Sequence, residues 1–270
     1  VKVAKRYNIK HVLEVNSPVV EEMSHFEGPD MLRFIGHFKE RKKLKYTSQV
    51  VTVSSALKKY LIDFYGCKKN IHVSPNAINT KLDKPSISKV QEFKSKYPSG
   101  TRILGFVGSL LPYHGVDLLV EAFAKVIKIR PNVHLLIVGD GVVRSSIEKL
   151  AKKILPSDSY TFTGTVPHSS VMNYIGTFEI AVMASSNWYG SPVKIFEYGW
   201  MGIPIIAPDN IPLRDVIKHK TDAYLVKNDI HELETAILYL LDNPVKSKEM
   251  GERFRTKIVE NYTWDIQTQN

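Results

Sequence analysis

Short apolar runs alternate along the whole chain with segments whose apolar residues recur at helical spacing. Nine runs have the length and the β-branched content of buried strands: 11–15, 49–53, 71–74, 103–107, 134–138, 160–162, 180–183, 203–207 and 223–226. Continuous apolar strands separated by amphipathic helices indicate parallel sheets with helices on both faces. We therefore expect an α/β protein that binds its ligands at the carboxyl ends of its strands.

One capped helix and one linker organise the first part of this pattern. Ser54 is expected to cap a helix whose apolar residues Leu57, Leu61 and Phe64 are spaced along one face. Residues rich in Pro, Ser, Asn and Lys then separate two periodic regions, and we place the domain boundary between residues 82 and 83. Only three strands precede it, too few for a stable doubly wound sheet. Because the chain also starts at Val1 and not at Met, we expect the sequence to begin inside a larger protein.

The composition limits the kinds of binding partner and the cellular compartment that we expect. The 270 residues carry a net charge of +10, which favours nucleotide phosphates, nucleic acid or an acidic membrane surface. The one cysteine, Cys67, excludes an internal disulfide and suits a reducing compartment. No apolar run approaches the roughly 18 to 20 residues of a membrane span, and no signal peptide is visible. We expect a cytoplasmic protein, with peripheral contact at the inner face of the membrane left open.

The densest basic run is Lys39–Tyr46, which contains five lysines and arginines. It is suited to dock on anionic lipid or on nucleic acid. However, Glu40 interrupts the run and no aromatic platform accompanies it, so a solvated helix face is the favoured interpretation.

A helix beginning near residue 191 has the most informative chemistry. Ser191 is predicted as its N-cap and Pro192 as its first residue, with Gly202 just past its end. Lys194 then falls in the first turn, where the helix dipole disfavours a cation, so we expect a negative group there. Glu197 shares the face of Lys194, and this pair suits a nucleotide diphosphate that carries a ribose. A surface Lys/Glu pair remains the alternative.

Three loops follow predicted strands and can contribute to the same site. In the first, Gly108 permits close backbone approach, Ser109 offers a hydroxyl, and His114 lies at the start of the next helix. In the second, residues 139–141 read Gly-Asp-Gly but lack the third glycine of a dinucleotide site, which argues against nicotinamide. In the third, residues 164–168 can present backbone groups to a base edge. Each loop also allows a purely structural role.

In this order, the motifs resemble those of glycosyltransferase family 4 (group 1), enzymes of GT-B architecture. The matching segments are 53–55, 74–79, 106–109, 114–122, 138–141, 162–166 and 190–198. The resemblance implies two Rossmann-like α/β domains with parallel sheets. Residues 1–82 would form the C-terminal part of the acceptor-side domain, only partly present because of an N-terminal truncation, and 83–270 the nucleotide-sugar-binding domain.

The resemblance also implies a function: retaining transfer of a hexose from a nucleotide-sugar donor to a glycan or lipid-linked acceptor, with no cofactor. Lys194 is expected to be catalytic. The expected donor-binding residues are Gly108, Ser109, His114, Gly115, Thr165, Val166, Gly190, Ser191, Val193 and Glu197.

The chain departs from the family pattern at three of its motif positions. Glu197 matches the second glutamate of the Glu-x7-Glu motif, which usually binds the donor ribose, but the first glutamate is replaced by Tyr189. Ser109 and His114 stand where the family commonly has Arg and Lys. Our hypothesis is that Lys194 supplies the missing positive charge, helped by a protonated His114.

The sequence also bears on metal dependence and on alternative functions. No Asp-x-Asp triplet occurs in the chain, so we expect transfer without a bound metal. The alternatives are a nucleotide-sugar-binding protein without transferase activity, a nucleotide-sugar epimerase, and a phosphorylase that would need a pyridoxal-binding lysine. Use of the basic surface for nucleic acid is a further alternative, but we expect no nucleic-acid partner.

Overall fold

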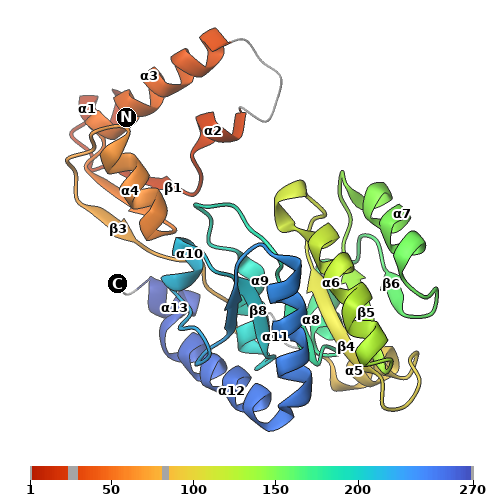
Figure 1. The fold of residues 1–270 in the computed structure, drawn as a ribbon. Coiled ribbons are helices and arrows are strands. Elements are labelled where there is room, and N and C mark those ends of the chain that lie inside the picture. Colours follow the sequence, from red (N-terminus) through yellow and green to blue (C-terminus); the bar gives the residue numbers. More distant parts are fainter. Residues whose placement is uncertain (1, 24–29, 81–84, 269–270) are drawn as a thin grey trace. The chain divides into compact units, whose positions relative to one another are not determined.

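The computed structural model describes residues 2–23, 30–80 and 85–268, and it is an α/β protein with two parallel sheets (Figure 1). The chain divides into two compact units. The first unit holds Val1–Asn76 and Trp188–Ser191, and the second holds Ala77–Asn187 and Pro192–Asn270. The boundary expected between residues 82 and 83 falls within residues 81–84, outside the described residues, and stays a prediction.

The first unit contains a three-stranded parallel sheet in the order β1-β2-β3. Its strands are β1 (Val12–Val15), β2 (Gln49–Thr52) and β3 (Ile71–Val73). Its helices are α1 (Lys2–Arg6), α2 (Val19–Met23), α3 (Asp30–Tyr46) and α4 (Ser55–Asp63). A small core of Leu44, Val50, Leu61, Tyr65 and Ile71 joins α3, α4 and the sheet.

Helix α4 begins as the sequence predicts. The Ser54 hydroxyl accepts a hydrogen bond from the amide of Leu57 at 3.1 Å, which satisfies one of the free donors of the first turn. Leu57 and Leu61 are buried. Phe64 directly follows the last helical residue, keeps helical dihedrals and is 47% exposed, so the buried part of this face ends at Leu61.

The second unit contains a six-stranded parallel sheet in the order β6-β5-β4-β7-β8-β9. The strands are β4 (Arg102–Val107), β5 (Val133–Val138), β6 (Tyr160–Phe162), β7 (Ile180–Val182), β8 (Ile205–Pro208) and β9 (Tyr224–Val226). All nine predicted strands are confirmed, with ends that differ by at most two residues. The carboxyl ends of β4, β5 and β6 therefore meet at one edge, followed by the three loops that the sequence singles out.

Helices cover both faces of this sheet. Alternate residues of the strands pack against α6 (Val116–Ile129), α7 (Arg144–Ile154) and α11 (Ile230–Asp242) on one face. The opposite face packs against α8 (His168–Ile175), α9 (Val193–Trp200) and α12 (Pro244–Asn261). Figure 1 shows α6 and α11 in front of the strands and α9 behind them. The shorter elements are α5 (Ile87–Lys94), η1 (Pro112–His114), α10 (Ile211–Arg214) and α13 (Trp264–Gln267).

The start of α9 differs from the prediction. Val193 is the first helical residue, and Pro192 precedes it in an extended conformation with φ −72° and ψ 119°. Ser191 does not cap the helix, because its hydroxyl accepts a hydrogen bond from the amide of Asn76 at 3.0 Å. The end agrees with the prediction, since Gly202 follows the helix with a positive φ of +66°.

Within residues 2–23, 30–80 and 85–268, no helix is both long and apolar enough to cross a bilayer.

Candidate functional site

Lys194 lies in the first turn of α9 with its side chain directed into the protein. The residue is only 9% exposed. Among the described residues, its Nζ atom has no hydrogen-bond acceptor. Nζ lies 4.3 Å from the centroid of the Phe106 ring, a cation–π contact that offsets part of the cost of burying the charge. A buried ammonium that lacks acceptors is costly, so the position is suited to an anion that can accept its hydrogen bonds.

Gly108 leaves the space that the ammonium occupies. It follows the last residue of β4 with a φ of +140°, and a Cβ atom there would lie 2.6 Å from the Lys194 Nζ atom. A side chain at position 108 would therefore have a disfavoured φ and would require the Lys194 ammonium to move. The sequence predicted close backbone approach at Gly108, and in the structure the group that approaches is the lysine.

Tyr198 couples α9 to the end of β4. Its side chain is fully buried, and its hydroxyl accepts a hydrogen bond from the amide of Val107 at 2.8 Å. Burial raises the pKa of this hydroxyl, so Tyr198 stays neutral. The bond fixes the helix that carries Lys194 against β4, the strand that Gly108 directly follows.

The protonation of Lys194 is poised near neutral pH. Burial lowers the pKa of its ammonium from 10.5 to about 7, and the nearby negative charge of Glu197 opposes this shift. An anion bound at Nζ would favour the charged form and raise this pKa again. Binding of an anion and uptake of a proton by Lys194 are thus coupled.

His114 is neutral, contrary to the expectation of a protonated imidazole. Burial and the positive charge of Lys194 lower its pKa to about 4, although the hydrogen bond that the imidazole donates to the backbone carbonyl of Ser109 opposes this. Its Nδ1 atom lies 2.5 Å from the carbonyl oxygen of Ser109, so Nδ1 carries the proton and donates. The Nε2 atom of His114 is then a hydrogen-bond acceptor. Of Gly108, His114 and Lys194, Lys194 alone carries a positive charge.

The structure thus brings Gly108, His114 and Lys194 together, and the other predicted residues are placed separately. Ser109 is exposed next to Gly108, and buried Gly115 links η1 to α6 with a φ of +63°. Thr165 and Val166 follow Gly164, whose carbonyl accepts a hydrogen bond from the amide of Gly139 at 3.1 Å. Val193 is exposed and Glu197 is half-buried on α9. The donor roles of these residues stay predictions.

Gly190 and Ser191 belong to the first unit. The segment Trp188–Ser191 contacts residues that follow each of the three strands of the first unit. The Ser54 hydroxyl donates to the carbonyl oxygen of Tyr189 at 2.6 Å, and Asn76 contacts Ser191 through two hydrogen bonds. The Tyr189 hydroxyl donates to the Glu22 carboxylate, which also accepts from Ser17 at 2.8 Å. Tyr189, where the family motif would have a glutamate, thus holds a carboxylate from another segment.

Three residues near the predicted site were not identified from the sequence. Phe106 and Tyr198 read as ordinary core positions of a strand and a helix, so no local signal distinguishes them. Arg144 binds the carboxylates of Asp140 and Glu148 at 2.7 and 2.8 Å, beside the loop that holds Gly164. The i, i+4 spacing of these three residues was the available signal.

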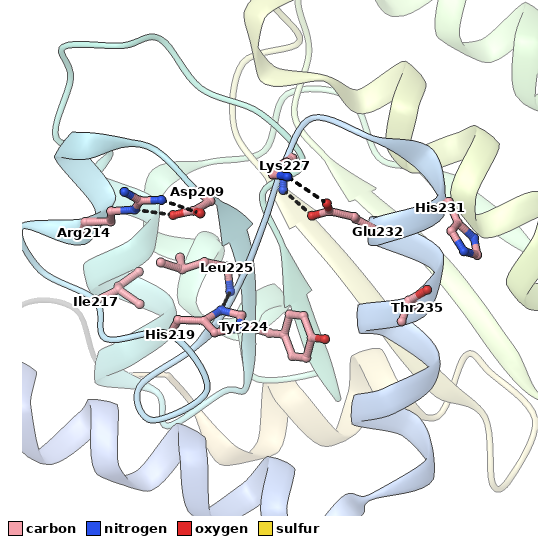
Figure 2. A pocket seen from close by; sticks show the side chains of 10 residues that line it. All are labelled: Asp209, Arg214, Ile217, His219, Tyr224, Leu225, Lys227, His231, Glu232 and Thr235. Atoms are coloured by element: carbon pink, nitrogen blue, oxygen red, sulfur yellow. Dashed lines mark hydrogen bonds and ion pairs between the residues drawn. The ribbon is translucent and has the colours of Figure 1, made fainter.

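A second polar region lies beside β9, the strand at one edge of the sheet. A hollow of about 600 Å³ is lined by β9, α10 and α11 (Figure 2). Its charged groups are paired: Arg214 contacts the Asp209 carboxylate at 2.5 and 2.7 Å, and the Glu232 carboxylate contacts both the backbone amide and the side chain of Lys227. This hollow therefore offers a ligand less unsatisfied charge than Lys194 does.

Comparison with known proteins gives a consistent result. The family described as "Glycosyl transferases group 1" matches residues 88–257, more than half of the chain. A GDP-mannose-dependent monoacylated alpha-(1-6)-phosphatidylinositol monomannoside mannosyltransferase of Corynebacterium glutamicum is 23% identical over 239 residues. That match covers 84% of this chain and 62% of the length of the relative.

Two solved structures are similar over nearly the whole chain. Sucrose-phosphate synthase from Thermosynechococcus elongatus has a TM-score of 0.84 at 22% identity, covering 99% of this chain and 68% of that one. Anabaena HepE, solved in complex with UDP and glucose, has a TM-score of 0.81 at 16% identity, covering 98% of this chain and 71% of that one. At these identities the likeness establishes the fold, and the expected GT-B type with parallel sheets is confirmed.

Proposed function

Because the chain belongs to the glycosyl transferases of group 1, we propose that the protein to which it belongs transfers a sugar from a nucleotide-diphosphate donor to an acceptor. The observation that carries this proposal is the ammonium of Lys194, buried without an acceptor beside Gly108 at the carboxyl edge of the sheet. The C. glutamicum relative is named as GDP-mannose-dependent, and HepE was solved with UDP. A nucleoside diphosphate is the anion that these proteins have in common.

Charge development explains the role of Lys194. During transfer the bond between the sugar C1 atom and the β-phosphate oxygen breaks, so negative charge grows on that oxygen. A cation that is already in place and shielded from water stabilises this charge without reorganisation. Lys194 meets both conditions, because α9, Phe106 and Gly108 fix and bury it.

Neutral His114 has a different role in this proposal. Its Nδ1 proton is held by the Ser109 carbonyl, so its Nε2 atom can accept a hydrogen bond from a sugar hydroxyl. It cannot supply the second positive charge that the sequence suggested. Neither of the two family cations, at positions 109 and 114, is then present in this chain, and Lys194 carries the positive charge at the phosphate alone among Ser109, His114 and Lys194.

The donor and the stereochemistry follow from the resemblance. We assign Glu197 to the donor ribose, and the loop residues Thr165 and Val166 to the base. We expect retention, in which the acceptor oxygen attacks C1 on the face that the phosphate leaves and its proton passes to the phosphate. An anomeric assignment of the product by NMR tests this, and inversion at C1 would contradict it.

The acceptor is proposed as a glycan or a lipid-linked glycan. The C. glutamicum relative is named for a phosphatidylinositol mannoside, which is a lipid-linked sugar. For such an acceptor we propose a peripheral protein that works at the surface of a membrane. We propose no nucleic-acid partner, and no cofactor besides the donor itself.

Donor binding and metal dependence test the proposal. Lys194→Ala should lower turnover and weaken diphosphate binding, whereas Glu197→Ala should mainly weaken nucleoside binding. Transfer should persist in the presence of a strong chelator, because an ammonium can take the place of a metal at the phosphate. Activity abolished by the chelator and restored by magnesium or manganese would contradict a metal-free site.

A further inference from the structure

Positive charge is concentrated in the first part of the chain. Residues 1–76 hold 14 of the 37 lysines and arginines but only 7 of the 27 acidic residues, which gives them +7 of the net charge of +10. Within this part, the exposed basic residues of α3 form the densest group. An anionic partner is therefore expected for the first unit, separate from the donor phosphate of the second.

One face of α3 packs against its own unit. Leu44 is buried in the core, and His37 and Glu40 each contact the Tyr65 hydroxyl at 2.8 Å. Gly36 faces the side chain of Val20 on α2. The Glu40 carboxylate is thus directed toward the packed face. It does not interrupt the basic surface, as the linear sequence suggested.

The opposite face of α3 carries two adjoining patches. The apolar patch consists of Phe34, Ile35 and Phe38, which are 75%, 39% and 62% exposed. The basic patch consists of Arg41, Lys42 and Lys45, all exposed.

The two patches are in register. Each basic residue follows one apolar residue by seven positions, which is about two helical turns, so both patches lie along the same face. The aromatic side chains of Phe34 and Phe38 therefore lie just before the basic run and on the same face as the basic patch.

We infer that this face of α3 docks on an anionic lipid bilayer. The apolar patch would enter the headgroup and acyl boundary while the basic patch contacts lipid phosphates, which is the arrangement of an interfacial amphipathic helix. This inference deepens the proposal of a lipid-linked acceptor, because it names the surface that meets the membrane. It can fail or hold without any transfer being measured.

The apolar patch is what favours lipid over nucleic acid. Phosphate contacts alone would explain three exposed cations, and nucleic acid supplies phosphates as well. Phe34 and Phe38 project from successive turns with an aliphatic side chain between them, and such a cluster gains free energy by leaving water for a hydrocarbon phase. A surface that binds both hydrocarbon and phosphate matches a lipid bilayer.

Vesicle sedimentation of the full chain tests the inference. The wild type should bind vesicles of phosphatidylcholine with about a third phosphatidylserine, and bind phosphatidylcholine alone at least about tenfold more weakly. The triple variant Arg41→Gln, Lys42→Gln, Lys45→Gln should lose about fivefold per charge, or roughly 100-fold. The double variant Phe34→Ser, Phe38→Ser should lose at least about tenfold for both vesicles. Circular dichroism shows whether each variant is folded.

Matched controls come from the second unit. Lys149, Lys152 and Lys153 are three exposed lysines on α7, and their change to Gln removes the same charge. Ile87 and Val245 are 75% and 71% exposed, and their change to Ser removes exposed apolar area. Both controls should keep vesicle binding within about twofold of the wild type.

Four outcomes would overturn the inference. The first is a wild type that binds neither vesicle. The second is an equal loss of vesicle binding in the α7 control, which would show that binding depends on the net charge of the chain and not on α3. The third is a wild type that is a dimer in solution and a Phe34/Phe38 variant that is a monomer, because this face would then bind a second copy of the chain. The fourth is binding of a single-stranded oligonucleotide, but not of vesicles, that depends on the basic patch.

Discussion

The second unit contains two charged regions that differ in how their charges are satisfied. In the hollow beside β9, Arg214 and Asp209 form a two-point pair, and Lys227 contacts Glu232 (Figure 2). At the start of α9, Lys194 is more deeply buried than any of these groups and has no hydrogen-bond acceptor among the described residues. The hollow has the volume of a ligand pocket, but the unsatisfied charge lies elsewhere.

This difference indicates where binding free energy is available. An ion that is already paired must break its pair before it can bind a ligand, so the net gain is small. An unpaired buried ammonium gains its first hydrogen bonds from the ligand. Unsatisfied charge, and not cavity volume, is therefore the basis on which we propose the anion site at Lys194.

The largest expected effect is the difference of about 4 kcal/mol between the variants of two lysines of the second unit. Lys194→Met should raise the free energy of unfolding at pH 6 by about 2 kcal/mol, because it removes a buried unpaired charge. Lys257→Met should lower it by about 2 kcal/mol, because it leaves the buried Asp222 carboxylate, 2.7 Å from Lys257 Nζ, without its cation. Urea unfolding measures both, and changes of the same sign would contradict the account.

The fold is largely predictable from the sequence, and the site only in part. Parallel strands such as β4 and β5 are buried on both faces, so their apolar runs are continuous and easy to find. The first residue of α9 was missed because the Ser191 hydroxyl is used by Asn76, 115 positions away. Neutral His114 was missed because its pKa depends on burial and on Lys194, which folding brings near.

The next effect concerns the space beside the ammonium. Gly108→Ala should lower the free energy of unfolding by about 2 to 3 kcal/mol, because a Cβ atom meets both a disfavoured φ and the Lys194 Nζ atom. Gly66→Ala is the matched control, since Gly66 also has a positive φ, +63°, but open space around it. It should cost about 1 kcal/mol. Equal losses in thermal or urea unfolding would show that Lys194 does not occupy the space at Gly108.

The pH dependence follows from the lowered pKa of Lys194. Between pH 7 and 10.5 the unfolded state binds a proton that the folded state has released, so this group makes folding more favourable as pH rises through that window. Diphosphate binding has the opposite dependence, because it needs the charged lysine. Affinity should fall by up to about tenfold per pH unit above pH 7. Calorimetry from pH 6 to 9 measures this, and an affinity independent of pH would refute the coupling.

The smallest expected effect concerns the link between α9 and β4. Tyr198→Phe removes the hydroxyl that accepts from the Val107 amide and should lower the free energy of unfolding by about 1 kcal/mol. If the link positions Lys194, diphosphate affinity should also fall, by about twofold to fivefold. A loss of stability with unchanged affinity would limit Tyr198 to a structural role.

The most direct test of the central claim is calorimetric titration of uridine and guanosine diphosphates into the wild type, Lys194→Met and Arg214→Met at pH 6.5. Loss of the buried ammonium should weaken both diphosphates by about 10 to 100-fold, the value of a charge-assisted hydrogen bond. Loss of Arg214, whose charge is already paired with Asp209, should change affinity by less than about twofold. Unchanged binding in Lys194→Met, or an equal loss in Arg214→Met, would contradict the claim that the unpaired lysine marks the site.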